Sequence, residues 1–303
     1  MKKQKKSQEN PLGTLPVNQL LKQFAVPSII AMLVSALYNS VDQFFIGHSV
    51  GGLGNAATNI AFPLTTSCIA VALLFGIGGA SAFNLAMGHG DEEEAVHYMG
   101  NAAISMFGCG VCLCLICQIF LDPLVYFFGA PENIAGYAKT YIRITSIGFP
   151  FLIMSSGGGH LIRADGSPKM SMICNLIGAI INTILDAMFV FGLHMGMAGA
   201  ALATIIGQFI SGGIAIRYLC HCKTVTLKRS HLKPHKKYIS RIMSLGGAPC
   251  SNQLAMMIVQ IVMNKSLTYY GSLSSFGESI PLACAGIITK VNQVFFSFII
   301  GIS

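Results

Sequence analysis

Long apolar segments separated by short polar turns recur along the whole chain of 303 residues. Each segment has roughly the 20 residues that a helix needs to cross the hydrocarbon core of a bilayer. They lack the strict alternation of membrane barrel strands, and unsatisfied backbone groups are too costly in lipid for other structures. The pattern therefore predicts eight membrane-spanning helices, at residues 24–46, 60–87, 99–121, 144–162, 170–193, 197–216, 242–264 and 280–303.

The composition excludes a water-soluble globular protein. Apolar residues make up 53% of the chain, charged residues only 10%, and the mean hydropathy is +0.65. In a soluble domain about a quarter of all residues are charged, so a water-facing surface cannot be built from this sequence. The first span is too long for a signal peptide and no small-residue cleavage site follows it, so we expect nothing to be removed. The expected fold class is an all-α polytopic membrane protein.

The net charge of +8 is concentrated in the segment before the first span and in two connections between later spans. If the spans simply alternate, these three segments share one side of the membrane, and the other side has only Lys139, Arg143 and Lys265. The positive-inside rule then predicts a plasma (inner) membrane protein with a cytoplasmic N-terminus. Membrane lipids are the expected partners of this charge, not nucleic acid, and no obligate protein partner is indicated. The basic residues of these three segments are Lys2, Lys3, Lys5, Lys6, Lys22, Arg163, Lys169, Arg217, Lys223, Lys228, Arg229, Lys233, Lys236, Lys237 and Arg241.

Four of the ten cysteines form two overlapping C-x-x-C patterns, which in other settings indicate metal binding. Cys109, Cys112, Cys114 and Cys117 lie in the middle of a span, without a nearby histidine or acid. Free cysteine behaves as a small apolar residue. We therefore expect neither a transition-metal site nor a cofactor in this protein.

A second copy of the first spans follows the long basic connection. With an offset of 222 residues, Pro27 falls on Pro249 and Asp42 on Asn264, while residues 79 and 81 fall on 301 and 303. Such repeats are common in transporters, which bind their substrate between the two halves. We predict a complete six-helix amino-terminal lobe at residues 1–222 and a basic cytoplasmic linker at 223–240. Residues 241–303 would be the first two helices of a carboxyl-terminal lobe, truncated after the eighth helix.

Two of the eleven acidic residues, Asp42 and Asp186, lie well inside predicted spans. Carboxylates are expensive in the membrane, so such residues indicate a functional site. Asn182 lies four residues before Asp186 on the same helix face, and Thr204 offers a hydroxyl from the next span. These oxygens suit Na⁺, while the carboxyl groups can instead hold a proton, because burial favours the neutral form. The alternative is a structural polar clamp between helices.

Proline and glycine at certain positions in these spans predict kinks and close helix packing. Pro27 removes one helical hydrogen bond from the first span and makes either a hinge or a static kink. The glycine-rich stretches at residues 76–79 and 157–159 lack the Lys-Ser/Thr of a phosphate loop. Close helix packing is the expected role of these glycines.

Residues 38–47, with the sequence Tyr-Asn-Ser-Val-Asp-Gln-Phe-Phe-Ile-Gly, resemble the first-helix motif of the multidrug and toxic compound extrusion (MATE) family. Residues 163–169, followed by Asn182, Asp186 and residues 199–204, resemble its signature from the fourth to the sixth span. The similarity covers essentially the whole chain, and the Asp at position 42 is typical of the DinF-like branch.

This resemblance implies a fold of twelve helices in two lobes and a secondary active antiporter that exports organic-cation drugs or toxic compounds in exchange for H⁺ or Na⁺. It assigns coupling of the cation or proton to Asp42, Asn182, Asp186 and Thr204. It also assigns the substrate cavity or its gating to four further residues. These are Tyr38, Asn39, Tyr141 and, as the bending point of the first helix, Pro27.

Three other functions are compatible with parts of this pattern. A lipid-linked oligosaccharide flippase of the same superfamily would line its cavity with cations, but only Lys290 lies deep in a span. An intramembrane aspartyl protease has its acids in Tyr-Asp and Gly-x-Gly-Asp contexts, which differ from Val41-Asp42 and Leu185-Asp186. A non-transporting fragment is the third alternative. We predict a transporter and not an enzyme.

Overall fold

The computed structural model describes residues 40–275 and 277–302, together with residues 26, 29, 30, 33, 34 and 37. Helices joined by short turns make up this part of the chain, which contains no strand. The helices are α3 (Gly52–Gly88), α4 (Glu92–Ile119), α5 (Leu121–Phe127), α6 (Glu132–Thr145), α7 (Phe149–Ala164), α8 (Pro168–Asp186), α9 (Gly196–Leu219), α10 (Lys236–Ser272) and α11 (Ser279–Ile302). A further helix runs through residues 40–49, and short 3₁₀ or π segments occur at Ser146–Gly148, Ala187–Gly192 and Arg229–Leu232.

The helices agree with the predicted spans in approximate position, and they differ at helix ends and in the fourth span. The first predicted span is only partly within the described residues. The third begins at Glu92 and not at residue 99, because Asp91 caps this helix by accepting a hydrogen bond from the backbone N–H of Glu94 at 2.9 Å. The three glutamates of the first turn, residues 92–94, also stabilise the positive end of the helix dipole.

The fourth predicted span is not one regular helix. It is formed by α6 and α7, which follow each other through the short 3₁₀ segment Ser146–Gly148. Pro150 lies in the first turn of α7, where its missing N–H needs no intrahelical partner. Between α4 and α6, the exposed carboxylate of Asp122 in α5 pairs with Lys139 at 2.7 Å, which lowers the pKa of Asp122. Asp122 therefore lies in water at the end of the third predicted span, as its place before Pro123 suggests.

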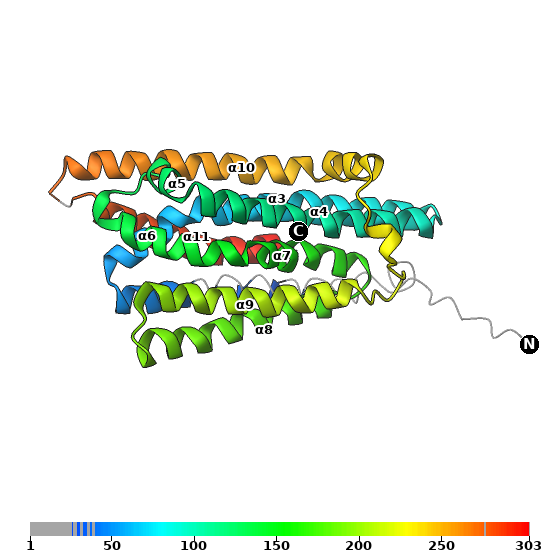
Figure 1. Ribbon diagram of the computed structural model, residues 1–303, viewed down its shortest axis with the longest axis horizontal. Helices are drawn as coiled ribbons and strands as arrows, with labels where there is room; N and C mark the ends of the chain where they lie inside the picture. Colours follow the sequence, from blue (N-terminus) through cyan, green and yellow to red (C-terminus); the bar gives the residue numbers. More distant parts are fainter. Residues whose placement is uncertain are drawn as a thin grey trace, which may run out of the picture.

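Helix α3 lies at the centre of the bundle and contacts α4, α6, α7, α10 and α11 (Figure 1). Its buried residues occur on all sides, and many of them are alanine or glycine. Small side chains let neighbouring helices approach closely, which is how helices associate in lipid, where the surrounding chains are as apolar as leucine. Most of the helix is therefore surrounded by protein, while a few side chains such as Leu85 (47% exposed) reach the outer surface.

Glycines allow the closest contacts of α3, as the sequence suggested for residues 76–79 and 157–159. A Cβ atom on Gly76 of α3 would lie 2.6 Å from the carbonyl oxygen of Gly157 in α7. On the other side of α3, a Cβ atom on Gly246 of α10 would overlap the backbone of Leu74. The adjacent Gly247 has nothing within 4 Å of its Cβ position.

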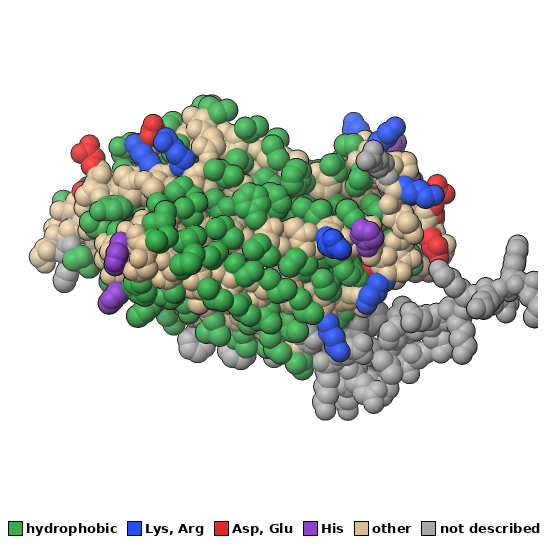
Figure 2. Space-filling view, turned by 60° about the horizontal axis from the view of Figure 1, so that its bottom comes forward, with side chains coloured by type: hydrophobic (Ala, Val, Ile, Leu, Met, Phe, Trp, Pro, Cys, Tyr) green, Lys and Arg blue, Asp and Glu red, His purple; other side chains and the backbone are tan. Residues whose placement is uncertain are grey.

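The outer surface of the bundle is apolar. Five of the described helices, α3, α4, α8 with its π segment, α9 and α10, are long and apolar enough to cross a membrane. Large apolar side chains point outward along them, for example Ile184 (60% exposed) and Val259 (65% exposed). In Figure 2 this apolar surface occupies the middle of the molecule, and charged side chains gather at its two ends. Such a surface is stable only in contact with lipid or another apolar partner.

A buried cluster of amide side chains connects α3 with α10. Asn59 donates to Asn264 Oδ1 at 3.0 Å, and Gln260 donates to the side-chain oxygens of both asparagines at 3.1 Å. At most 7% of any of these three side chains is exposed. Each amide is satisfied by the other helix or by its own, so the cluster ties the two helices together without an unpaired polar group.

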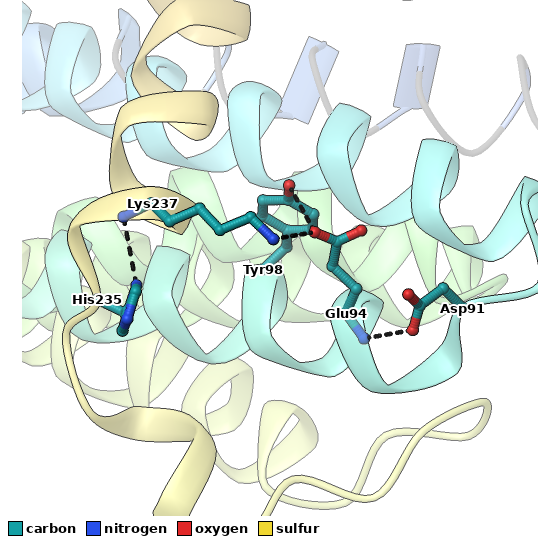
Figure 3. A network of polar contacts seen from close by, with 5 residues as sticks. All are labelled: Asp91, Glu94, Tyr98, His235 and Lys237. Atoms are coloured by element: carbon teal, nitrogen blue, oxygen red, sulfur yellow. Dashed lines mark hydrogen bonds and ion pairs between the residues drawn. The ribbon is translucent and has the colours of Figure 1, made fainter.

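At the other end of α10, far from the amide cluster, the first turn of the helix binds α4 (Figure 3). Glu94 Oε1 accepts from Lys237 Nζ at 3.2 Å and from the hydroxyl of Tyr98 at 3.4 Å. Just before α10, the backbone N–H of His235 donates to the buried Asn101 of α4 at 2.8 Å. The connection between α9 and α10 therefore lies against α4 before it enters the membrane.

The glycine contact between α3 and α10 leads to a stability prediction. Gly246→Ala should lower the thermal unfolding midpoint in detergent, because overpacking typically costs about 1–3 kcal/mol and here the neighbour is rigid backbone. Gly247→Ala is the matched control, since its methyl group meets open space. Alanine in place of glycine then adds about 0.5–1 kcal/mol of helix stability. Equal unfolding midpoints for the two variants would show that Gly246 is not a tight contact.

Candidate functional site: a buried carboxylate cluster

Asp186 is the last residue of α8 and is completely buried. The chain continues into the π segment Ala187–Gly192, in which the backbone is wider than in an α-helix. Such π segments occur frequently at functional sites, because they redirect side chains and free backbone groups within a helix. The acid thus lies at the one place along this span where the regular helix changes.

Asn182 connects Asp186 with α9. With its amide nitrogen toward the acid, it donates to Asp186 Oδ2 at 3.2 Å and accepts from the backbone N–H of Thr204 at 3.2 Å. In the opposite orientation the amide faces the Thr204 hydroxyl at 3.5 Å. That hydroxyl also donates to the carbonyl of Ala200 at 3.0 Å. The structure therefore brings together three of the four residues that the resemblance assigned to ion coupling.

Asp42, the fourth, comes to the same place from the helix through residues 40–49 and is 5% exposed. Its carboxyl group is near enough to Asp186 to interact with it electrostatically. Two ionised carboxylates within electrostatic range of each other repel strongly where water is excluded. The pair is therefore suited to hold a shared proton or a cation.

The approach of α8 and α9 depends on two glycines that face each other beside this cluster. A Cβ atom on Gly178 would lie 2.8 Å from the Cβ of Ser211, and one on Gly207 would lie 2.9 Å from the carbonyl oxygen of Gly178. Larger residues would push the helices apart and separate Asn182 from the backbone of Thr204. Small residues at this crossing thus position the polar groups.

A small polar cavity adjoins the cluster, between α7, α8 and α9. It has a volume of about 70 Å³, and its lining includes Asn182, Thr204, Ser155 and Ser211. The hydroxyls of Ser155 and Ser211 are hydrogen-bonded to each other across it. A water needs roughly 10–15 Å³ in this measure. The cavity therefore has room for a few waters or a hydrated cation, but not for a drug-sized molecule, which needs about 300 Å³ or more.

A larger open cavity of about 490 Å³ lies beside the helix through residues 40–49, facing α11. Gln43, Asn55, Phe44 and His48 line it. The Phe44 and His48 rings stack at 6.1 Å, and the side-chain oxygens of Gln43 and Asn55 accept no hydrogen bond from the described residues. This volume falls in the range of ligand pockets. The protein thus has a cation-sized cavity between α7, α8 and α9 and a drug-sized one beside the helix that carries Asp42.

The structure describes only one of the residues predicted for the substrate cavity or its gating. Tyr38, Asn39 and Pro27 lie outside the described residues, as does the side chain of Lys290. Tyr141 lies on α6 and packs against the hydrophobic core, and its carbonyl accepts a hydrogen bond from Thr145 at 2.8 Å. The assignment of Tyr38, Asn39, Tyr141 and Pro27 to the substrate cavity or its gating stays a prediction.

Sequence reasoning did not single out Gln43 and Asn55 of the larger cavity, or Asn59 and Gln260 of the amide cluster. All four are uncharged polar residues in apolar surroundings. A search for intramembrane amides, in addition to acids, could have found them. Asn264 did carry a signal, since the internal repeat aligns it with Asp42. The structure gives it a buried polar environment in the second copy as well.

Comparisons with known proteins agree with this geometry. The MatE family profile matches residues 27–188, just over half of the chain. Multidrug export protein MepA of Staphylococcus haemolyticus (strain JCSC1435) is 29% identical over 266 residues, which cover 86% of this chain and 59% of that relative. MepA of Staphylococcus aureus (strain MRSA252) is 24% identical over 295 residues, which cover 93% of this chain and 65% of the relative.

Solved structures show the same fold. The MATE multidrug transporter DinF-BH, solved in complex with a ligand, superposes with a TM-score of 0.89 at 30% identity, over 98% of this chain and 65% of that one. An outward-facing MATE family transporter of the MOP superfamily gives a TM-score of 0.78 at 22% identity, over 93% of this chain and 61% of that one. The chain thus spans 59% to 65% of the length of these relatives. On the strength of the family profile and of the shared fold, this multi-pass, all-helical membrane protein belongs to the MATE family, whose members are transporters and not enzymes.

Proposed function

We propose that the protein is, with a complete second lobe, a secondary active antiporter that exports organic-cation drugs or toxic compounds in exchange for H⁺ or Na⁺. The observation that carries this proposal is the buried pair of Asp42 and Asp186, bridged to α9 through Asn182. Its relatives support the substrate class, since they include multidrug export proteins and a multidrug transporter solved in complex with a ligand.

The two cavities suggest how ion and drug are coupled. The coupling ion would bind at the carboxylate cluster, and the drug would bind in the larger cavity beside Gln43 and Phe44. Asp42 and Gln43 are neighbours in the sequence and Gln43 lines the larger cavity, so a change of charge at Asp42 would alter the position or field of the residues around the drug space. An ion can drive export only through such a difference between the two states of the protein.

Removing either carboxylate should abolish this coupling. In a version with both lobes, Asp42→Asn and Asp186→Asn should each eliminate ethidium efflux driven by an ion gradient, with expression near normal, because asparagine has similar volume but carries no charge. Fluorescence of ethidium in inverted vesicles measures this. Wild-type efflux rates in both variants would remove the cluster from the mechanism.

Thr204→Val distinguishes the two ions within the same experiment. A hydroxyl is a ligand for Na⁺ but is not needed to hold a proton on a carboxyl group. The variant should therefore weaken Na⁺-driven efflux and leave H⁺-driven efflux close to normal. Thr183→Val is the matched control, since its hydroxyl makes the same bond to a backbone carbonyl four residues back, at Ala179.

We also propose the orientation that the positive-inside rule predicts, with residues 217–241 in the cytoplasm. In a cysteine-free background, a cysteine at Ser230 should resist an impermeant thiol reagent in intact cells and react in inside-out vesicles. A cysteine at the exposed Glu132, at the other end of the bundle, should show the opposite pattern. Reaction of position 230 from outside would invert the proposed topology.

Alternating access needs two lobes that move against each other around a central cavity. Following the predicted division, residues 1–222 form one lobe, and α10 and α11 are part of the second. The 303-residue chain should therefore give no drug resistance in a pump-deficient bacterium. The same chain, extended by the remaining second-lobe helices of a relative such as MepA, should restore ethidium efflux. Equal efflux from both would show that the first lobe works alone.

A further inference from the structure

The turn between α7 and α8 contains a buried acid that the carboxylate cluster does not use. Asp165 is 1% exposed, and its two oxygens accept four hydrogen bonds. The donors are the hydroxyl of Tyr218 (2.7 Å), the backbone N–H groups of Lys223 (2.8 Å) and Thr224 (3.1 Å), and the hydroxyl of Thr224. This single carboxylate holds the end of α9 and the first residues of the following connection against the start of α8.

Next to this bond network, an open groove runs between the first turn of α8 and the last turns of α9. Met170, Ile214, Arg217, Tyr218 and His221 line it, and its volume is about 280 Å³. Tyr218 contributes its ring to the wall while its hydroxyl is bonded to Asp165. The groove is thus built from an organised helix end and not from a flexible loop.

One basic residue lines the groove, and two more adjoin its lining residues in the structure. Arg217 is exposed on its wall, Lys169 is exposed directly before the lining residue Met170, and the backbone of Lys223 is held near Tyr218 because both bind Asp165. Between residues 166 and 277 the sequence contains one acid, Asp186, which is buried at the other end of α8. Asp165 itself is enclosed by its four donors. These elements therefore place no exposed carboxylate beside the groove to neutralise its cations.

The other half of the groove is apolar and leads toward the middle of the membrane. Met170 and Ile214 are partly exposed in it, and Ile173 follows on α8 with 38% of its side chain exposed. In Figure 2, basic side chains border the apolar surface at this end of the bundle. A free phosphate ion would use only the charged half. A molecule with an anionic headgroup and a hydrocarbon chain matches both halves.

We propose that this groove binds an anionic phospholipid, with the phosphate at Arg217 between Lys169 and Lys223, and with an acyl chain along Met170 and Ile173. Arginine is well suited to phosphate, since its planar guanidinium presents several donors. Asp165 acts as a positioning residue, because it holds Tyr218 and Lys223 in place. The site depends on the location of the protein in a membrane and not on its transport activity.

Photocrosslinking tests the site directly. The full chain is reconstituted in phosphatidylcholine vesicles that contain a photoactivatable phosphatidylglycerol or, in a parallel sample, a photoactivatable phosphatidylcholine, and labelled peptides are mapped by mass spectrometry. Phosphatidylglycerol should label the peptides that contain Met170 and Ile214 more strongly than phosphatidylcholine does. Arg217→Gln should lower this labelling roughly fivefold, which corresponds to the contribution of one basic residue near an anionic surface.

Matched variants separate a specific groove from general attraction. Lys233→Gln removes the same charge from the part of the connection that lies near α4, where the carbonyl of His231 faces Asn101, and it should leave the labelling unchanged. Arg217→Lys keeps the charge and should retain most of the labelling, which also checks that the helix end stays folded. Equal labelling by both lipids, or an equal loss in Lys233→Gln, would overturn the proposal. So would competition by inorganic phosphate, which would identify a free anion as the ligand.

Discussion

The structure depends on one constraint: in hydrocarbon, every polar group must find its partner inside the protein. This requirement makes the chain helical. It places amide side chains such as Asn59 and Asn264 between helices, where they satisfy one another. It also explains why large apolar side chains cover the outside, in contrast to a soluble protein. Close contact between helices then depends on glycine and alanine, because packing replaces the hydrophobic effect as the source of association.

The carboxylate cluster is the place where this constraint is not fully met. Asp186 has one oxygen bonded to Asn182, but no described side chain donates to the other. Burial of an unsatisfied carboxylate is unfavourable by several kcal/mol, on the order of what a bound proton or cation returns. In the proposed antiport, a change of occupancy at this site would alter the helix through residues 40–49, whose residues Gln43 and Phe44 line the larger cavity.

Water-facing ends of the bundle follow different rules, since charge is stable there. At one end Asp122 pairs with Lys139, and at the other Glu94 pairs with Lys237. Asn101 and Asp165, both buried, hold the connection between α9 and α10 through backbone N–H groups. The connection is therefore part of the folded structure near α4 and α8. This arrangement leaves its many basic side chains free to face the aqueous phase or the lipid headgroups.

The sequence by itself determined the all-helical membrane class, the approximate positions of the helices from residue 60 onward and the candidate acids. Hydropathy and turn chemistry act over a few residues, so they can be read locally. Capping by Asp91 shifted one helix start, and the 3₁₀ segment before α7 interrupted one span, because such ends depend on single side-chain contacts. Only the tertiary structure decided that Asp42 comes within electrostatic range of Asp186, that Asn59 meets Asn264 across 205 positions, and that a small and a larger cavity form between the helices. Contacts between distant segments depend on how whole helices pack, and no local pattern contains that information.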